Sequence, residues 1–597
     1  MSSSAAAELR KHTAAMAGLF ESRVSSFKGR PEILPLLKPV DKSIALQAAK
    51  NVFGEGEWQC VGIDGSMDYD ERMQMILFYV SGTGYRCPLT VSQDQALFDL
   101  REAQRDKNLS VTAAVPIWVE DAASLVTHRP LGETEFEFIY SMEGIPFALM
   151  LMAELYLAHL ASMEDRTKLI LLDRPLSSTF PSILRDLRML LRLRTSNLLG
   201  IETPKGELTK LDLQLAAVLG SGQRYLPTRG QHLVARAIKE LLGGEKTRKE
   251  LASSLGLQGS DFDRLVRRLV RFDELEDKML LDHCDLSSIK VREGVKDYWE
   301  RILHVTSQIL LKVFRTKGEH PLLLGEDKWL TVLDLNAVNF FLLLTLIDSV
   351  NSRGKLLVGT AKDTTATDLT RAILPYASWQ GDLKADVAIP KVRNDKAFLA
   401  ILSATNADRI QTPWRLCAYD SCFTTLLDNH DPNVPLRAAR KVVAGEQLFV
   451  RAYFQLRSFK TDPIIRSPVF LYDRPFQREL DEKFIRKFTV LERDDRHDLH
   501  PFFEGGDFSE LDNLILYLLA SSDNPEVVEA FGHNQLLYLA DKAVKAHVKS
   551  MRGALRGVAD LQLSSLARRE RIFTVISRYR DMRAESELRR TRFARRG

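Results

Sequence analysis

The chain has 597 residues, 45% of them hydrophobic and 27% charged, and 83 Lys and Arg against 79 Asp and Glu leave a net charge of +4. These proportions are typical of a folded globular protein and exclude a chain that is disordered over most of its length. The longest apolar runs, residues 145–153 and 340–347, are shorter than the roughly 20 residues that cross a bilayer. Without a span or a recognisable secretion signal, the sequence predicts a cytoplasmic protein with no membrane contact.

The sequence pattern predicts an α/β fold interrupted by a helical insertion. Two β-rich runs within residues 58–91 flank a polar turn, residues 139–160 are apolar on nearly every helical face, and residues 168–172 suit a buried strand. After a charged helical block, strand patterns return near residues 355–363, 442–456 and 467–476. The expected units are an N-terminal helical segment (1–51), a first core part (52–194), the helical insertion (195–324), a second core part (325–550) and an Arg-rich helical tail (551–597).

The insertion contains a pattern typical of a helix-turn-helix. Thr247 and Glu250 form a capping box, Gly256 predicts a helix end, and a second helix is expected from Ser260. That second helix carries Arg264, Arg267, Arg268 and Arg271. These side chains could contact DNA. A helical hairpin with solvent-exposed arginines fits the same pattern, and both interpretations remain open.

The tail concentrates positive charge. Residues 551–597 hold 13 Arg and no Lys against five acidic residues, a local balance of +8, which leaves −4 for the first 550 residues. Such a segment suits phosphate or an acidic protein surface. A solvated helix is the alternative, and so is a docking helix, because a partial apolar stripe runs through Leu561, Leu563, Leu566, Ile572 and Val575.

Three carboxylates have unusual surroundings. Asp64 closes the strand expected at residues 59–63, before a turn that begins at Gly65, and Asp173 closes the strand expected at 168–172. Glu154 interrupts the apolar helix, where an ionised side chain is costly unless it is paired or bound to a cation. If the two strands are neighbours, the three carboxylates converge. Oxygen ligands of this kind suit Mg²⁺ or Mn²⁺, ions that activate water in phosphodiester cleavage.

Each carboxylate also has a structural explanation. Asp64 could cap its turn, Asp173 could begin a helix with Pro175, and Glu154 could pair with a buried arginine such as Arg185 or Arg188. No P-loop, GxGxxG, HExxH or GxSxG motif occurs, so an ATPase, a common dehydrogenase and a serine hydrolase lose support.

The motifs resemble the NurA nucleases. The resemblance consists of IDGS at residues 63–66, the 19-residue spacing from Glu154 to Asp173, and VGTAKD at residues 358–363. It implies an RNase H-like core with a mixed central sheet, Mn²⁺-dependent DNA cleavage, a homodimer, and cooperation with a HerA-like hexameric translocase.

The same resemblance implies roles for single residues. Asp64, Glu154 and Asp173 correspond to the metal ligands, and His533, on a late helix after Pro525, corresponds to a fourth. An imidazole ligand favours Mn²⁺ over Mg²⁺, and we expect two ions. Lys362 would hold the scissile phosphate, with an exposed loop lysine as the alternative. The family usually has Gly and Ser after the second Asp, where this chain has Arg174 and Pro175.

The sequence therefore predicts a metal-dependent DNA nuclease that works with a HerA-like ATPase in DNA end processing, repair or defence. Catalysis would rest on Asp64, Glu154, Asp173, His533 and Lys362, with nucleic acid also bound by Arg264, Arg267 and Arg268. Two alternatives remain: a non-catalytic DNA-binding adaptor on the same core, and an RNase H-like nuclease that acts on RNA or hybrids.

Overall fold

The computed structural model describes residues 2–569 except 28–30, 73–74, 119–143, 194–195, 223–231, 316–317, 326–327, 363, 385–393, 426–433, 435, 439–445, 460, 493–494 and 524–530. Residues 570–597, with Ile572 and Val575 of the expected tail stripe, lie outside the described residues, and so does Pro525.

One mixed sheet of eleven strands organises the fold, in the order β1-β11-β14-β15-β10-β6-β2-β3-β4, with β5 paired to β3 and β12 to β14. The pairs β2–β6 and β6–β10 are parallel, and the other pairs are antiparallel. The expected mixed α/β architecture is confirmed. The strands are β1 (Leu37–Pro39), β2 (Gly56–Arg72), β3 (Met75–Val91), β4 (Ala96–Phe98), β5 (Gln104–Trp118), β6 (Thr167–Leu172), β10 (Leu356–Ala361), β11 (Trp414–Leu416), β12 (Tyr419–Asp420), β14 (Phe449–Gln455) and β15 (Phe470–Pro475).

Strands β2 and β3 form a long hairpin that continues past the neighbouring strand. β2 pairs with β6 only as far as Ile63, opposite Leu172, whereas its pairing with β3 continues to Arg72. The turn predicted after Asp64 is therefore wrong, because the strand runs straight through it. The glycine at position 65 serves close packing instead: a Cβ there would lie within 3 Å of side-chain atoms of the helix behind the strand.

Two long apolar helices, α5 (Gly144–Met163) and α12 (Val332–Ser352), pack against each other on one face of the sheet, together with α6 (Leu176–Leu193). By length and composition, both α5 and α12 could cross a membrane. The expectation from the shorter apolar runs is corrected here, because those runs are parts of 20- and 21-residue helices. In the fold, 67% and 72% of the two apolar stretches are buried, as in core helices of globular proteins.

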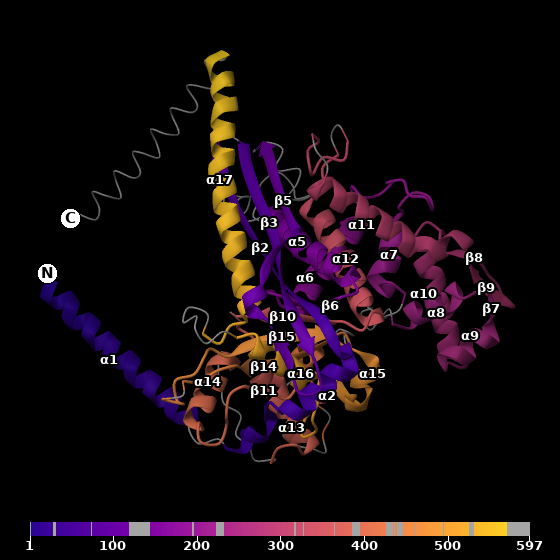
Figure 1. Cartoon of the computed structure of the whole chain (residues 1–597). Helices are drawn as coiled ribbons and strands as arrows, with labels where there is room; N and C mark the ends of the chain where they lie inside the picture. The colour runs from indigo at the N-terminus through magenta and orange to yellow at the C-terminus, as the bar shows by residue number, and fades with distance from the viewer. Residues whose placement is uncertain are drawn as a thin grey trace.

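The opposite face of the sheet is covered by α2 (Lys42–Phe53), α16 (Glu510–Ser521) and α17 (Gln535–Arg569). α17 lies along β2 and β3 and extends past the sheet (Figure 1). Its first turn touches the strand directly, since a Cβ at Gly62 would lie 2.8 Å from the Cβ of Leu536. Glycine at this position thus lets the helix approach the sheet.

The Arg-rich segment is not separate from the core as far as it is described. α17 runs across the boundary expected at residue 550, and its C-terminal half contains the first arginines of the segment. Arg552 pairs with Asp68 at 2.7 Å, and Arg556 pairs with Asp70 at 2.7 Å. Both aspartates belong to β2, so these arginines hold the helix against the hairpin.

The insertion contains a small sheet as well as helices. The expected helix pair is confirmed as α9 (Arg248–Leu255) and α10 (Gly259–Leu275), with Gly256 between them in the left-handed conformation (φ 68°). The unpredicted strands β7 (Lys246–Thr247), β8 (Leu281–Cys284) and β9 (Ser288–Val291) have only two to four residues each. The insertion also includes α7 (Lys210–Leu219), α8 (His232–Leu242), η4 (Glu293–Asp297) and α11 (Tyr298–Phe314).

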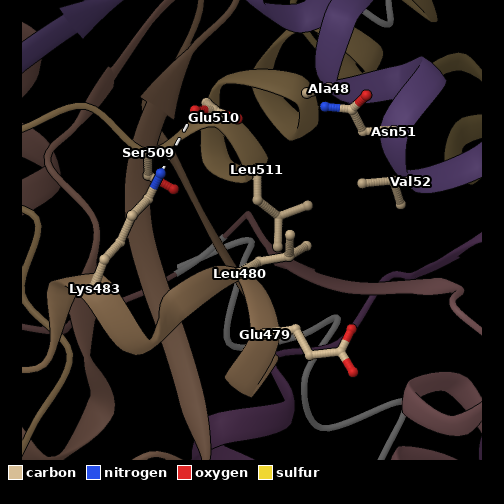
Figure 2. A pocket seen from close by; sticks show the side chains of 9 residues that line it. All are labelled: Ala48, Asn51, Val52, Glu479, Leu480, Lys483, Ser509, Glu510 and Leu511. Carbon is tan, nitrogen blue, oxygen red and sulfur yellow. Dashed lines mark ion pairs between the residues drawn. The ribbon is translucent and has the colours of Figure 1, made fainter.

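A cavity of about 150 Å³ lies between α2, α16 and the short helix α15 (Arg478–Asp481) (Figure 2). Leu480 and Leu511 point toward it, and Lys483 and Glu510 form an ion pair at 3.5 Å beside it. The lining residues bring together no nucleophile and base, and none belongs to the site described below.

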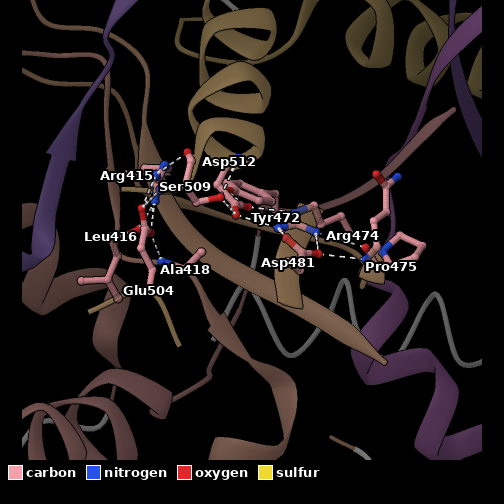
Figure 3. A network of polar contacts seen from close by, with 11 residues as sticks. Arg415, Leu416, Ala418, Tyr472, Arg474, Pro475, Asp481, Glu504, Ser509 and Asp512 are labelled. Atoms are coloured by element: carbon pink, nitrogen blue, oxygen red, sulfur yellow. Dashed lines mark hydrogen bonds and ion pairs between the residues drawn. The ribbon is translucent and has the colours of Figure 1, made fainter. Parts of the chain in front are cut away.

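The C-terminal half of the core is held by a buried set of ion pairs, here called the arginine network: Arg415, Arg474, Asp481, Glu504 and Asp512 (Figure 3). Arg415 contacts Glu504 at 2.7 Å, and Arg474 lies between Asp481 and Asp512, with contacts of 2.7 to 2.9 Å to both. The remaining elements are α1 (Ser2–Phe27), η1 (Pro31–Leu36), η2 (Leu100–Glu102), η5 (Leu369–Ile373), α13 (Leu374–Gln380), α14 (Asp395–Thr405), η6 (Ser421–Thr425), β13 (Leu436–Arg437), η7 (Glu482–Phe484), β16 (Phe488–Glu492) and β17 (Asp495–Leu499).

Candidate active site beside the parallel strands

Asp64 and Asp173 lie next to each other where β6 ends. Asp64 directly follows Ile63, the last residue of β2 that pairs with β6, and Asp173 directly follows Leu172, its partner. The backbone N–H of Asp173 donates to the carbonyl of Ile63 at 3.3 Å. The predicted meeting of these two carboxylates is therefore supported by the strand register.

Glu154 reaches the same place from α5. It is 3% exposed, and its Oε1 atom lies 2.5 Å from the position that a Cβ of Gly65 would take, so it touches the backbone next to Asp64. Its carboxylate forms an ion pair with Arg174, with an Nη2 to Oε1 contact of 3.2 Å. An arginine partner was one of the two explanations for Glu154, but the partner is Arg174, whereas the exposed Arg185 contacts Asp186.

A fourth carboxylate, Asp541 of α17, belongs to the site and was not predicted. Its charge acts on Asp64, whose pKa it raises, and it pairs with Lys545, one helical turn later, at 2.6 Å. A signal was present in the sequence: Asp541 interrupts the buried face formed by Leu537, Ala540 and Val544, as Glu154 interrupts α5. Asp64, Glu154, Asp173 and Asp541 are called the carboxylate site below.

The charges of the carboxylate site act mainly on Asp64. Burial, and then repulsion from Asp173, Glu154 and Asp541, raises the pKa of Asp64 to about 9, against a hydrogen bond from the N–H of Gly65 at 2.8 Å. For Asp541, burial acts to raise the pKa, but the contact with Lys545 outweighs it and leaves the pKa lowered.

Three basic side chains accompany three of the four carboxylates. Lys362 follows β10, and its Nζ lies 2.5 Å from Oδ2 of Asp173, while Arg174 and Lys545 pair with Glu154 and Asp541. Asp64 forms no ion pair with any described residue. Asp64 is therefore the carboxyl group of the site whose charge, once ionised, no basic side chain offsets.

The donor set fits a divalent cation by its chemistry. Among the described residues, no three acidic, histidine or cysteine side chains stand in a geometry that holds a metal ion as they are, because Glu154, Asp173 and Asp541 turn to their basic partners. Yet Asp64 experiences repulsion from Asp173, Glu154 and Asp541, and a cation between these carboxylates would offset it. Hard oxygen donors around a buried, uncompensated carboxyl group are the ligands that Mg²⁺ and Mn²⁺ prefer.

His533 lies beside the site but not on a helix, which corrects the prediction, since α17 begins only at Gln535. Its Nδ1–H donates to the carbonyl of Asn534 at 2.8 Å, which leaves the lone pair on Nε2. Burial, and then the positive charge of Lys362, lowers the pKa of His533, although the negative charges of Asp173 and Asp541 act to raise it. The charges of Lys362, Asp173 and Asp541 thus influence the pKa of His533, so His533 lies near the site. The lowered pKa favours the neutral imidazole, the form that binds a metal ion.

The predicted nucleic-acid-binding arginines lie apart from the carboxylate site. Arg264, Arg267 and Arg268 are exposed on α10, in the insertion, which is on the other side of the molecule from α17 in Figure 1. Arg264 pairs with Asp261 on its own helix at 3.1 Å. The structure thus separates these arginines from Lys362, which is in the site.

No protein-family model matches the sequence, and no curated protein matches it. Among solved structures, the chain is similar to the NurA nuclease from Sulfolobus solfataricus, with 10% identity and a TM-score of 0.35 over 93% of this chain and 95% of that one. It is also similar to NurA with manganese (12% identity, TM-score 0.34, 92% of this chain and 98% of that one) and to NurA bound to dAMP and manganese (14% identity, TM-score 0.34, 90% and 92%). The NurA resemblance noted in the sequence thus recurs among solved structures. Because the identities and TM-scores are low, the function proposed below rests on the side chains of the site.

Proposed function

We propose that the chain is a metal-dependent nuclease that hydrolyses phosphodiester bonds of DNA at the carboxylate site. The observation that supports this most strongly is Asp64, which is 7% exposed, surrounded by three further carboxyl groups, and without an ion pair among the described residues. Burying such a group costs stability, and a purely structural role gains nothing in return. A bound divalent cation would compensate it.

The strand order supports an RNase H-like core. The strands β5-β3-β2-β6-β10 are consecutive neighbours, and β3 alone runs against the others. This is the order and direction of the five strands in RNase H-like folds. Asp64 lies on β2, the first of these five strands along the chain, and Asp173 directly follows β6, the fourth; in this proposal the two adjacent carboxylates are metal ligands.

The side chains have separate tasks in this proposal. Asp64, Asp173 and Asp541, with Glu154, would hold the cation, and Nε2 of His533 is the nitrogen ligand available to it. A cation bound there lowers the pKa of water and neutralises charge that develops on the phosphate. Lys362, a third exposed and in contact with Asp173, can reach a phosphate oxygen as a point charge.

The same proposal extends to the metal ion, the oligomeric state and the partner. An imidazole ligand would favour Mn²⁺ over Mg²⁺, and two ions, a homodimer and a HerA-like translocase partner follow from the sequence resemblance. The inserted helices and the Arg-rich tail remain the surfaces proposed to contact DNA or the partner.

The deciding experiment is cleavage of end-labelled single- and double-stranded DNA with Mn²⁺, with Mg²⁺ or with EDTA. We expect Mn²⁺-dependent cutting that falls by about a thousandfold in Asp64→Asn, because loss of a metal ligand removes several kcal/mol of transition-state stabilisation. Asp68→Asn is the matched control: it lies four residues further along β2, where its only described ion pair is the partly exposed contact with Arg552.

Two results would contradict the proposal. If the unaltered protein binds DNA without cutting it under any metal condition, also with a candidate translocase present, the adaptor interpretation replaces the nuclease. If RNA or an RNA–DNA hybrid is cut and DNA is not, the chemistry stands but the substrate is wrong. A shift of the melting temperature on adding Mn²⁺, absent in Asp64→Asn, measures metal binding independently of activity.

A further inference from the structure

The insertion contains a unit with its own order of elements. Along residues 232–291, helix α8 is followed by β7, the helices α9 and α10, and the hairpin β8–β9, and the three strands pair in the order β7-β9-β8. The core of the unit is formed by residues of all three helices and of β8 and β9, and it is shared with residues of α7, η4 and the start of α11. A helix, a short strand, a helix-turn-helix and a closing hairpin in this order make a winged helix-turn-helix.

The second helix of the pair is held with one face outward. Phe262, Leu265, Val266 and Leu269 of α10 are buried in the core of the unit. The turn before α10 is fixed by the capping box of α9 and by Gly256 in the left-handed conformation. The rotation of α10 about its own axis is therefore set by its buried face, and the side chains on the opposite face are exposed to solvent.

The outward face of α10 is a stripe of four arginines. Arg264, Arg267, Arg268 and Arg271 follow one another at intervals of three, one and three residues, all are exposed, and together they lie opposite the buried face. The acidic residues of the helix surface, Asp261, Asp263 and Glu274, lie at the two sides of this stripe. The stripe is about 10 Å long at a rise of 1.5 Å per residue.

The hairpin next to α10 differs in character. Its turn places Leu286 in solvent, 91% exposed, and the side chain of Asp285 accepts hydrogen bonds from the N–H groups of Ser287 and Ser288. An acidic turn does not approach phosphates. The hairpin turn therefore adds no positive charge to the stripe of arginines on α10.

We propose that residues 232–291 bind double-stranded DNA, with α10 in the major groove and its four arginines on phosphates and base edges. The major groove of B-DNA, about 12 Å wide, admits a helix, whereas the deep, narrow major groove of duplex RNA does not. The charge of the stripe is complementary to the phosphate backbone. This proposal goes beyond the nuclease function: it assigns a second DNA-binding surface that does not depend on the carboxylate site.

The test measures duplex DNA binding by the full-length protein in EDTA, so that failure of the nuclease proposal leaves the assay unaffected. Fluorescence anisotropy at several salt concentrations gives both the dissociation constant and its salt dependence. Replacing all four arginines of the stripe by alanine should weaken binding at least tenfold at 0.1 M salt. It should also lower the slope of log affinity against log salt by about 3 to 4, because each lost phosphate contact removes about one ion.

Two control proteins make the result specific. Alanine at Arg101, Arg166, Arg371 and Arg409, four exposed arginines outside the unit, removes the same net charge and should leave affinity and slope nearly unchanged. Lysine at the four stripe positions should keep the slope, because it keeps the phosphate charges.

An equal loss in the stripe variant and in the control variant would overturn the proposal, since net charge alone would then explain binding. Unchanged duplex binding in the stripe variant would overturn it as well and would make the stripe a surface for a protein or for solvent. Each of the two double variants, R264A/R267A and R268A/R271A, should show about half of the change in slope. They test the proposal independently if the fourfold variant folds poorly.

Discussion

The arginine network and the carboxylate site are two buried polar clusters with opposite balances. In the network, Arg474 lies between Asp481 and Asp512, and the pKa of Asp512 falls to about 2, because Arg474 and its other partners outweigh the burial that acts to raise it (Figure 3). In the site, burial and the neighbouring carboxylates raise the pKa of Asp64 to about 9. The difference teaches that burial alone does not mark a functional carboxylate. A functional carboxylate is marked by burial without a basic side chain that would compensate its charge.

The largest effect on stability should come from the network. Arg474→Ala leaves Asp481 and Asp512 buried without their arginine, and an unpaired buried charge costs about 3–5 kcal/mol. Guanidinium denaturation of the unaltered and the variant protein measures this loss. A loss below about 1 kcal/mol would mean that the network is not a structural counterpart of the site.

Removal of the positively charged side chain of Lys362 should affect activity more than folding. Lys362→Ala is expected to lower kcat/KM for DNA cleavage by about a hundredfold, the size of a lost charge contact to a reacting phosphate. It should lower the free energy of unfolding far less than Arg474→Ala does, because Lys362 is a third exposed, whereas Arg474 is buried. Destabilisation as large as that of Arg474→Ala would instead assign Lys362 a structural role.

The pH dependence of stability separates Asp64 of the site from Asp512 of the network by sign. Asp64 has a raised pKa in the folded state, about 9 against an ordinary 3.8, so the folded chain holds a proton that the unfolded chain releases between these values. Its contribution to stability is complete below about pH 4 and is lost as the pH rises toward 9, by about 1 kcal/mol per unit. Asp512 behaves oppositely: its contribution is present above about pH 4 and is lost as the pH falls toward 2.

Denaturation in EDTA at pH 6, 7 and 8 tests this, with the difference between the unaltered protein and Asp64→Asn as the measured quantity. The variant should show the flatter pH dependence. Parallel curves would mean that Asp64 is already ionised, and the contrast with the network would disappear.

The smallest effect should come from the ion pair between Arg552 and Asp68. Both side chains are about a third exposed, so Arg552→Ala should change the free energy of unfolding by less than about 1 kcal/mol. The same denaturation series measures it. A loss comparable to that of Arg474→Ala would show that the outer half of α17 contributes far more to the fold than its exposed contacts indicate.

Local patterns were sufficient for several elements and for part of the site. The unbroken apolar runs predicted α5 and the buried strand β6, and strand patterns predicted β10, β14 and β15. Glu154 was found because an acid within an apolar helix is costly wherever that helix packs. The capping box and Gly256 predicted the helix pair of the insertion because caps and left-handed glycines act within a few residues.

Local patterns failed where a distant segment determines the conformation. The glycine after Asp64 suggested a turn, but it lies in strand β2. A glycine is needed there because α5 packs too closely against the strand to leave space for a side chain. The strands of the winged unit were missed because each has only two to four residues, too few to show a strand pattern, and β7 pairs with β9 some 40 residues later. Asp541 was missed because its environment depends on which strand α17 covers.

The sequence by itself determined the chemistry that is available: three of the four carboxylates, the lysine after β10 and the arginine stripe of α10. The tertiary structure alone decided which of these meet. It placed Asp541 against Asp64, paired Glu154 with Arg174, and kept the arginines of α10 away from the carboxylate site. The physical reason is the range of the forces: propensity and capping act within a few residues, whereas the pKa of a buried carboxyl group depends on charges brought to it by strands and helices from distant parts of the chain.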